Sequence, residues 1–295
     1  MTQSGDRASD GGAKERRRSR ILRGFSLKEE GAKAVLIATV STLVVLGLLA
    51  YAAVSSPYWP EFKDEFLNRQ VFAESFPDIL RAFKRNIFYF LTAEPVILAF
   101  ALMLAVLRSL RGPVFFPLRA LSTIYVDLFR GIPTVLVVFA LGFGIPTLRI
   151  PGFPVEGWFW GWVALILSYS AYVAEVYRAG IESVHPSQTA ASRALVLSRW
   201  QSLRSVVIPQ AVRRVVPPLM NDFISLQKDT ALIAFVSAFS AEAFLKAQRI
   251  SAGDFNFTPF VGAALCFLII TIPMTRFTDW LLERQRKRRM AGGLA

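Results

Sequence analysis

The stretch that decides the fold is Ala34–Val54, AVLIATVSTLVVLGLLAYAAV, which holds 21 residues and no charge. A helix of about 20 apolar residues crosses a hydrocarbon core of about 30 Å, so this stretch predicts a membrane-spanning helix. Pro57 and Pro60 follow it and predict its end. The whole chain of 295 residues is 54% hydrophobic and only 19% charged. An ordinary soluble domain carries about 25% charged residues, so the composition also indicates a membrane protein.

Five further apolar segments raise the prediction to about six transmembrane helices in an all-α, polytopic membrane fold. They cover residues 87–107, 123–144, 158–178, 216–239 and 258–281. The segment 158–178 begins in a cluster of tryptophans and phenylalanine, which is typical of a helix entering the membrane interface. The segment 216–239 is the least apolar because it contains three charged residues.

These helices divide the chain into five parts. Residues 1–33 are predicted to be a disordered basic cytoplasmic tail, and residues 34–54 the first transmembrane helix. Residues 55–80 are expected to form an extracytoplasmic linker, and residues 81–284 the main transmembrane domain with a cytoplasmic loop at 179–215. Residues 285–295 form a second basic tail. A secretory signal peptide fits the N-terminus poorly because both its polar and its apolar segments are too long.

The loop charges predict the orientation. Six helices place both termini on one side of the membrane, and the segments on that side carry 22 lysines and arginines against 8 on the other side. Because basic loops stay in the cytoplasm, we expect both termini to be cytoplasmic and the protein to lie in the cell membrane. This asymmetry accounts for the net charge of +13 without a nucleic-acid partner. If the segment 216–239 is re-entrant, the C-terminal tail faces outward instead.

The sequence offers little for catalysis or metal binding. One cysteine, Cys266, excludes an intramolecular disulfide, and one histidine, His185, excludes a histidine-rich metal site. His185 is interpreted as an ordinary loop residue. No GxxxxGK[ST] stretch occurs, so any ATP that drives transport must be held by another subunit.

The loop 179–215 predicts two short helices. Pro186 and Ser187 indicate a helix start in which Ser187 caps the first amides, and the helix would cover 188–197. A second helix, 199–207, would end before Pro209. This hairpin could lie at the lipid interface, or it could dock another protein, because its small residues let a partner backbone approach closely.

At this loop the chain resembles the membrane subunits of ABC importers of the polar amino acid family, whose fold is a type I transmembrane domain. The family's loop motif begins Glu-Ala-Ala, continues to a Gly, and ends at a proline with fixed spacing. The matching positions are Ala190, Ala191, Ser192, Val196, Val206 and Ile208–Pro209, with Gly180 and Gln188 upstream, Asn221 and Lys228–Thr230 downstream, and Arg130–Pro133 in an earlier helix. The agreement covers about residues 75–284.

Three positions depart from the family pattern. Ala190 stands in place of the Glu, Val196 in place of the Gly, and Ala231 in place of a Ser. The loss of the acid is compatible with one of two unlike permease subunits, and an identical pair also stays open. A β-branched residue is strained at positive φ, so we expect the helix to continue through Val196.

The resemblance implies a permease that has no enzymatic activity of its own and binds no cofactor. ATP and magnesium would be held by a dimer of separate ATPase subunits, and the other expected partners are a second permease, an extracytoplasmic amino-acid-binding protein and the lipid bilayer. The residues expected to couple to the ATPase are Gly180, Gln188, Ala190, Ala191, Ser192, Leu195, Val196 and Pro209.

Polar residues inside the predicted helices mark a candidate pathway. At 100° per residue, five of them fall within about a 120° arc of the segment 216–239: Asn221, Asp222, Ser225, Lys228 and Asp229. Intramembrane charges usually face a bundle interior or a water-filled cavity, so this stripe and Arg130 could face the pathway. Lys228 and Asp229 could instead form ion pairs that lock one conformation.

Other charges have structural interpretations. Asp127 and Arg130 lie three residues apart on one helix face, and we favour a structural ion pair between them. Glu175 and Arg178 could simply hold the end of their helix at the interface.

An ion-coupled secondary transporter of small polar solutes is the alternative function. Its acidic relay would use Glu94, Asp127, Asp222 and Asp229. No internal repeat between the two halves of the chain supports this alternative. A membrane scaffold without transport would leave these charges unexplained.

Overall fold

The structure is a computed structural model that describes residues 33–292 except 111, 238–241 and 255. The described residues are helical with no β-strand, as the all-α prediction requires. The chain divides into two units, residues 1–63 and 64–295. The predicted N-terminal tail 1–33 lies outside the described residues except for Lys33.

The first unit contains the helix Lys33–Val54, which has 22 residues and is long and apolar enough to cross a membrane. All of its side chains are exposed within this single chain. A helix of this length and composition is suited to the hydrocarbon core of a membrane, and its bounds agree with the helix predicted at 34–54. The short helix α2, Trp59–Phe66, follows it.

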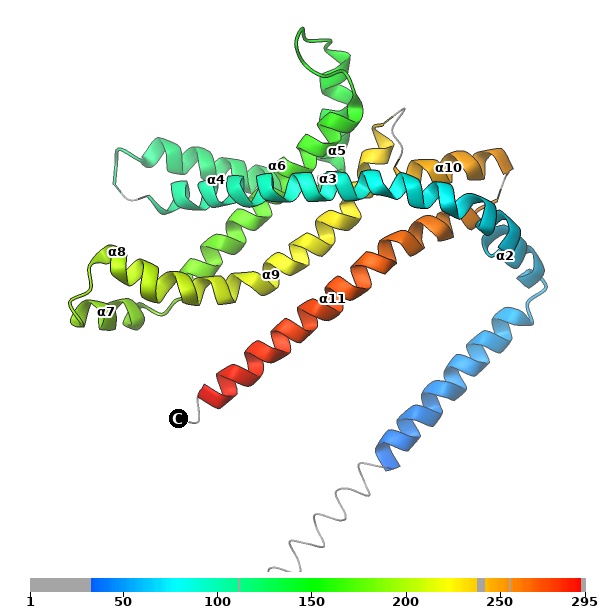
Figure 1. The fold of residues 1–295 in the computed structure, drawn as a ribbon, viewed down its shortest axis with the longest axis horizontal. Helices are drawn as coiled ribbons and strands as arrows, with labels where there is room; N and C mark the ends of the chain where they lie inside the picture. The colour runs from blue at the N-terminus through cyan, green and yellow to red at the C-terminus, as the bar shows by residue number, and fades with distance from the viewer. Residues whose placement is uncertain (1–32, 111, 238–241, 255, 293–295) are drawn as a thin grey trace, which may run out of the picture. The chain divides into compact units, whose positions relative to one another are not determined.

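The second unit holds the remaining helices (Figure 1). In chain order they are α3 (Arg69–Ser109), α4 (Phe116–Gly131), α5 (Thr134–Thr147), α6 (Gly157–Glu182), α7 (Pro186–Ala194), α8 (Arg199–Ser202), the π-helix Leu203–Val207, α9 (Ile208–Asp229), the 3₁₀-helix Thr230–Phe235, α10 (Ala243–Asp254) and α11 (Thr258–Gly292). The Asn68 side chain caps α3 by accepting hydrogen bonds from the amides of Gln70 and Val71 at 3.0 and 3.2 Å.

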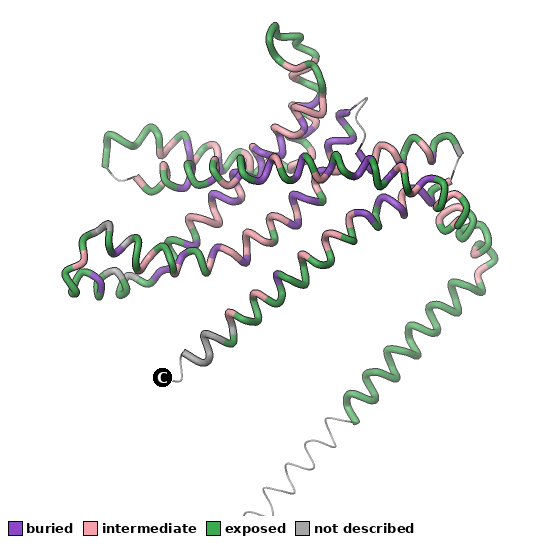
Figure 2. The backbone as a smooth tube through the Cα atoms, in the orientation of Figure 1, coloured by how far each residue is buried: buried purple, intermediate pink, exposed green. Residues whose placement is uncertain are grey.

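Helix α6 is the centre of this unit, because it contacts α3, α4, α5 and α9. The main hydrophobic core forms where these helices meet, and its largest fully buried side chains include Tyr89, Ile97 and Leu165. The buried stretches gather on α6 and on the facing parts of α3 and α9 (Figure 2). A second core joins α3, α10 and α11 and includes the single cysteine, Cys266.

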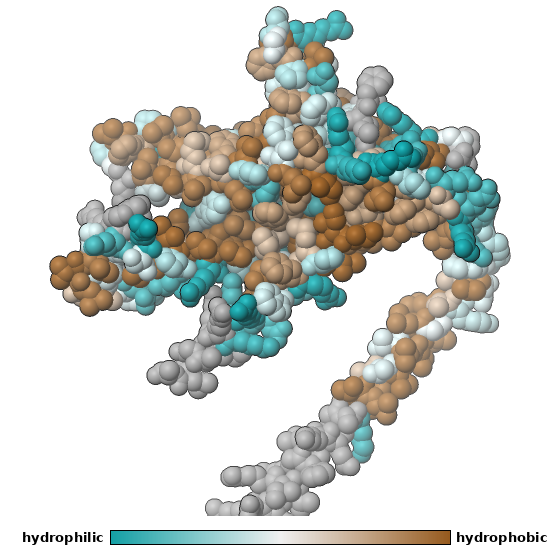
Figure 3. Space-filling view, in the orientation of Figure 1, coloured by the Kyte–Doolittle hydropathy of each residue, from teal (hydrophilic) through white to brown (hydrophobic). Residues whose placement is uncertain are grey.

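The surface of α3 and α11 carries many exposed large hydrophobic residues, such as Leu91 and Leu102 on α3 and Ile269 on α11. Figure 3 shows a broad hydrophobic surface over these helices. In water such a surface would drive association. In a bilayer it meets lipid, so the second unit is also membrane-embedded.

Within the part of the chain that the structure describes, four helices meet the length and hydropathy required of a membrane span: Lys33–Val54, Trp59–Ser109, Gly157–Glu182 and Thr258–Gln285. The span expected at 123–144 is not one straight helix. It is the pair α4 and α5, bent by 101°. The bend follows from Pro133, which has no amide hydrogen and disfavours helix at Ile132, where the backbone is extended.

The span expected at 216–239 also differs in its bounds. Helix α9 begins at Ile208 and ends at Asp229, and the 3₁₀-helix carries the chain on to Phe235. The prediction that helix stops before Pro209 was wrong, because the π-helix 203–207 leads directly into α9 and Pro209 lies in the first turn of α9. A proline is tolerated there because amides of the first turn need no helical partner.

Candidate functional site

The loop between α6 and α9 folds as a helical hairpin built from α7 and α8. Its first helix begins at Pro186, one residue earlier than the expected cap Ser187. The cap is His185, whose Nδ1 accepts a hydrogen bond from the Ser187 amide at 3.2 Å. His185 is therefore a capping residue, and its interpretation as an ordinary loop residue missed this contact.

Hydrogen bonds close the hairpin on itself. Ser192 is buried, and its hydroxyl contacts the Ser202 hydroxyl on the opposite arm. At the open end, Gln210 Nε2 donates to Gln188 Oε1 at 3.3 Å. Small side chains such as Ser allow the two arms to approach closely.

Helix α7 ends earlier than its predicted end at 197. Its last residue is Ala194, and Val196 adopts φ of +61°. The Val196 amide donates to the Arg193 carbonyl at 2.9 Å, and the Leu197 amide donates to the Ser192 carbonyl at 3.2 Å. This pair of bonds is the Schellman motif, in which the left-handed residue is usually glycine.

The expectation that the helix continues through Val196 was therefore wrong. The chain keeps the left-handed turn even though a β-branched residue opposes it, because the two closing hydrogen bonds and the Ser192 contact hold it. The free-energy cost of a positive φ at one residue is smaller than the combined stabilisation from these contacts.

The outer face of the hairpin is left uncovered. Ala190 and Ala191 are exposed, Leu195 is 75% exposed, and Val196 is 90% exposed. Figure 2 shows this part of the chain mostly as exposed backbone. An apolar tip that the rest of the chain does not cover is a contact surface for lipid or for another protein.

The base of the hairpin is a close helix crossing. Gly180 on α6 is buried, and a Cβ atom there would clash with Cγ2 of Val215 on α9. Nearby, the Arg214 guanidinium donates to the Ser183 carbonyl at the end of α6. Pro209 is exposed in the first turn of α9. Gly180 therefore packs the base of the loop and does not reach its exposed face.

A charge cluster joins three helix ends beside this crossing. The Glu175 carboxylate accepts from Arg108 at the end of α3 at 2.9 Å, contacts Arg178, and lies 3.8 Å from Arg130 at the end of α4. Arg178 also contacts Glu182 at 2.5 Å. Glu175 is thus the common partner of three arginines. Sequence reasoning missed this cluster, because Arg108 and Glu175 lie 67 residues apart.

The expected ion pair between Asp127 and Arg130 is absent from the described residues. Asp127 is exposed without an ion pair, and Arg130 turns to Glu175 on another helix. The i, i+3 spacing permits a pair on one helix, but the Arg130 guanidinium lies 3.8 Å from the Glu175 carboxylate on α6 instead.

The polar stripe of α9 has an exposed and a buried part. Asn221 and Lys228 are exposed, and Ser225 is half-buried. Asp222 is half-buried, and its Oδ2 atom is enclosed with no hydrogen-bond partner among the described residues. The Asp229 carboxylate accepts from the Tyr169 hydroxyl on α6 at 2.8 Å. Asp229 therefore joins α9 to α6, and Lys228 forms no ion pair within the described chain.

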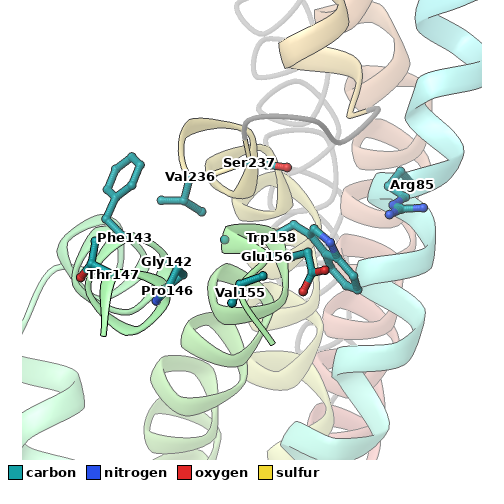
Figure 4. Close-up of a pocket in the computed structure, with 11 residues that line it drawn as sticks. Arg85, Gly142, Phe143, Pro146, Thr147, Val155, Glu156, Trp158, Val236 and Ser237 are labelled. Atoms are coloured by element: carbon teal, nitrogen blue, oxygen red, sulfur yellow. The ribbon is translucent and has the colours of Figure 1, made fainter. Parts of the chain in front are cut away.

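A pocket of about 500 Å³ lies at the other end of α6 from the hairpin. Its walls come from α3, α5, the start of α6 and the residues after the 3₁₀-helix (Figure 4). Val236 forms part of the wall and packs against Gly142 and Gly157, where a Cβ atom would clash with it. The polar side chains that line the pocket are Arg85, Thr147, Glu156 and Ser237.

The described residues hold no group of three or more histidine, cysteine, aspartate or glutamate side chains able to ligate a metal ion. The polar groups of the α9 stripe and of the pocket can form hydrogen bonds and ion pairs with a small polar solute.

Comparison with known proteins places these features in a family context. Residues 97–288 match the family described as "Binding-protein-dependent transport system inner membrane component". The "Probable glutamine ABC transporter permease protein GlnM" of Bacillus subtilis is 34% identical, over 68% of this chain and 91% of its own length. The "Glutamine transport system permease protein GlnP" of Escherichia coli K12 is 33% identical, over 56% of this chain and 74% of its own.

A solved structure, "Crystal structure of an amino acid ABC transporter with histidines", superposes with a TM-score of 0.64. It is 25% identical in sequence, and the match covers 72% of this chain and 96% of that one.

Proposed function

Because the chain belongs to the family of binding-protein-dependent transport system inner membrane components, we propose that it is the membrane permease subunit of an ATP-driven importer of amino acids. The observation that carries this proposal is the family match over 97–288, which includes the hairpin and the polar helix α9. The permeases named for glutamine and the amino acid transporter of similar fold support the substrate class.

The hairpin is proposed as the contact with a separate ATPase subunit. Its exposed apolar tip at Leu195 and Val196 supports this role, because a partner can bury both side chains. Burial of apolar surface is worth about 25 cal/mol per Å². Gly180, Gln188 and Ser192 hold the hairpin in its shape through their contacts with Val215, Gln210 and Ser202. They are proposed to affect the ATPase contact by positioning the tip.

The pathway is proposed to run along the exposed edge of the α9 stripe. Asn221 and Lys228 remain uncovered in a single chain, so they are available to a solute or to a second permease subunit. Asp222, Ser225 and Asp229 lie further inside the same stripe. Arg130 is held by Glu175 and lies at the end of α4, and its proposed role is to keep this end of the pathway in place.

The orientation is proposed from the charge asymmetry of the loops. The hairpin side carries the excess of basic residues, so it would face the cytoplasm together with both termini. The pocket at the start of α6 would then face the outside, where an amino-acid-binding protein delivers its cargo.

The proposed assembly contains two permease subunits, identical or related, and an ATPase dimer that holds ATP and magnesium. This chain contributes no ATP-binding loop. Hydrolysis would therefore depend on the ATPase partner, and this chain itself would act as a conduit without enzymatic activity.

Reconstitution tests the proposal. The chain is co-expressed with its ATPase and its binding protein, purified as a complex and placed in liposomes. We expect uptake of radiolabelled amino acids into the liposomes. This uptake should require ATP on the membrane side that carries the ATPase and the binding protein on the opposite side. Uptake that persists without ATP and follows an ion gradient would contradict the proposal and favour a secondary transporter.

A further inference from the structure

Two exposed side chains of opposite charge line the pocket at the start of α6, and neither forms an ion pair with a described residue. The Arg85 guanidinium from α3 forms no such ion pair, and its hydrogen bond to Tyr89 uses only Nε. The Glu156 carboxylate forms neither a hydrogen bond nor an ion pair with a described residue. Figure 4 shows the two side chains on either side of the Trp158 ring.

Arg85 is fixed in this position by its neighbours. Its Nε donates to the Tyr89 hydroxyl at 3.2 Å, and that hydroxyl donates to Glu242 Oε1 at 2.8 Å. The guanidinium also lies 5.3 Å from the Trp158 ring centroid, a cation–π distance. The two terminal nitrogens keep their donors for a ligand, and this fork matches a carboxylate in two parallel hydrogen bonds.

Glu156 lies where an acidic side chain would ordinarily cap its own helix. It is the N-cap residue of α6, yet its carboxylate makes no capping hydrogen bond. An N-cap carboxylate usually accepts from the amides two or three residues on. Its charge is therefore available to the pocket, where it suits an ammonium group.

The remaining lining is largely apolar. Phe143, Pro146, Val155, Trp158 and Val236 form most of it, and the volume of about 500 Å³ is within the range of small-molecule pockets, about 300–1,000 Å³. One cation, one anion and an apolar wall correspond to the three parts of an α-amino acid whose side chain is uncharged.

We infer that this pocket is a receiving site for a zwitterionic amino acid with an uncharged side chain, in which Arg85 binds the carboxylate and Glu156 binds the ammonium. The inference rests on the proposed function, since it gives that transporter a site at its outer end. It also predicts selectivity among amino acids. The α-carboxylate and the α-ammonium, which all of them share, occupy both charges of the pocket and leave none for a charged side chain. A charged side chain would find no further counter-charge among the described residues that line the pocket, and an unpaired charge against a largely apolar wall is costly.

The test uses the reconstituted importer with its ATPase and binding protein, and radiolabelled glutamine, leucine and lysine as probes. Arg85→Gln and Glu156→Gln each remove one charge. Arg85→Lys keeps the charge but removes the fork. Arg81→Gln and Glu74→Gln are matched controls, because both residues are exposed on the same helix α3 outside the pocket.

We expect each pocket variant to lower uptake of glutamine and leucine about tenfold, the loss typical of one charge-assisted contact. Arg85→Lys should retain more uptake than Arg85→Gln, and the controls should match the parent. ATP hydrolysis stimulated by the empty binding protein should stay at the parental rate in every variant, since docking and coupling are untouched.

Three results would overturn the inference. The first is parental uptake in both charge-removing variants. The second is an increase in the binding-protein concentration needed for half-maximal stimulation, which would make these residues part of the docking surface. The third is rescue of uptake when Arg85→Glu and Glu156→Arg are combined, which would show that the residues pair with each other.

A direct measurement covers the case in which a variant assembles poorly. The difference in tryptophan fluorescence between the parental complex and Trp158→Phe reports on Trp158. This difference should change on addition of glutamine or leucine, and the same change should require at least a tenfold higher concentration of lysine. No response to any amino acid would overturn the inference. If the parental complex imports no amino acid under any condition, the proposed function fails as well, which separates the two outcomes.

Discussion

Glu175 on α6 accepts a hydrogen bond from Arg108 at the last turn of α3, at a distance of 2.9 Å. The two side chains are only 20% and 15% exposed, so the bond is better shielded from water than an ordinary surface ion pair. Two further arginines, Arg130 and Arg178, share the same carboxylate. One acidic group thus holds the ends of α3 and α4 against α6.

Replacement of this acid should loosen the junction. We expect Glu175→Gln to lower the free energy of unfolding by about 2 kcal/mol, because Arg108 would remain enclosed without its partner. Thermal unfolding of the detergent-solubilised protein measures the change. Asp127→Asn is the matched control, since Asp127 is exposed and forms no ion pair among the described residues. Equal midpoints for the two variants would contradict this role of Glu175.

Replacement of the left-handed residue at the end of α7 should stabilise the chain, unlike replacement of Glu175. Val196 adopts φ of +61°, which costs a residue with a Cβ atom about 1–2 kcal/mol. Val196→Gly should therefore stabilise the hairpin and slow hydrogen exchange of the α7 amides about fivefold. Leu195→Gly is the control, because Leu195 has a negative φ of −84° and gains nothing from glycine. Faster exchange in Val196→Gly would show that the turn is not strained.

The exposed tip of the hairpin should control assembly with the ATPase. Leu195→Asp places a charge where a partner would bury an apolar side chain, and burial of an unpaired charge is costly. Co-purification of the ATPase and ATP-driven uptake should fall together, while expression in the membrane is retained. Ala252→Asp on α10 serves as the control, being exposed at a distance from the hairpin. Full ATPase binding by Leu195→Asp would show that the ATPase contact lies elsewhere on the chain.

Two substitutions separate the possible roles of the α9 stripe. Lys228→Met and Asn221→Ala should change the apparent affinity or the selectivity among amino acids, because both side chains are exposed toward the proposed pathway. Competition among labelled substrates in liposomes measures this. Altered basal ATP hydrolysis with unchanged selectivity would assign the stripe a conformational role instead.

Cysteine labelling tests the orientation. In a Cys266→Ser background, single cysteines at Ser187 and Ala252 are both exposed and can react with a membrane-impermeant thiol reagent. Intact cells should label position 252 and spare position 187. The reverse pattern would invert the proposed topology.

Hydropathy predicted most of the transmembrane helices because lipid contact requires long uncharged runs. Lys33–Val54, Trp59–Ser109, Gly157–Glu182 and Thr258–Gln285 all cover predicted spans. Helix α9, with 22 residues, is long enough for a span but not apolar enough, because its charged and polar residues lower its hydropathy. Its existence was predicted, but its bounds shifted by eight residues at the start, from 216 to 208.

The candidate site was less accessible to sequence reasoning because its contacts join distant residues. No periodicity connects Glu175 with its partner Arg108, or shows that Arg85 and Glu156 line the same pocket. The turn at Val196 also contradicts local preference, and only the hydrogen bonds that close it explain its conformation. A glycine at the matching position of the family motif was a usable signal that the chain turns here.

The contact of Gly180 with Val215 has a mechanical consequence. Gly180 has no side chain, and only the stiff β-branched side chain of Val215 lies between the two helices, so little displacement can be absorbed through rotamer changes. A push on the hairpin tip therefore passes into α6 and α9 as the rotation of a rigid lever about this point. The far end of α6, about 35 Å away along the helix from Gly180 to Gly157, would move the greatest distance.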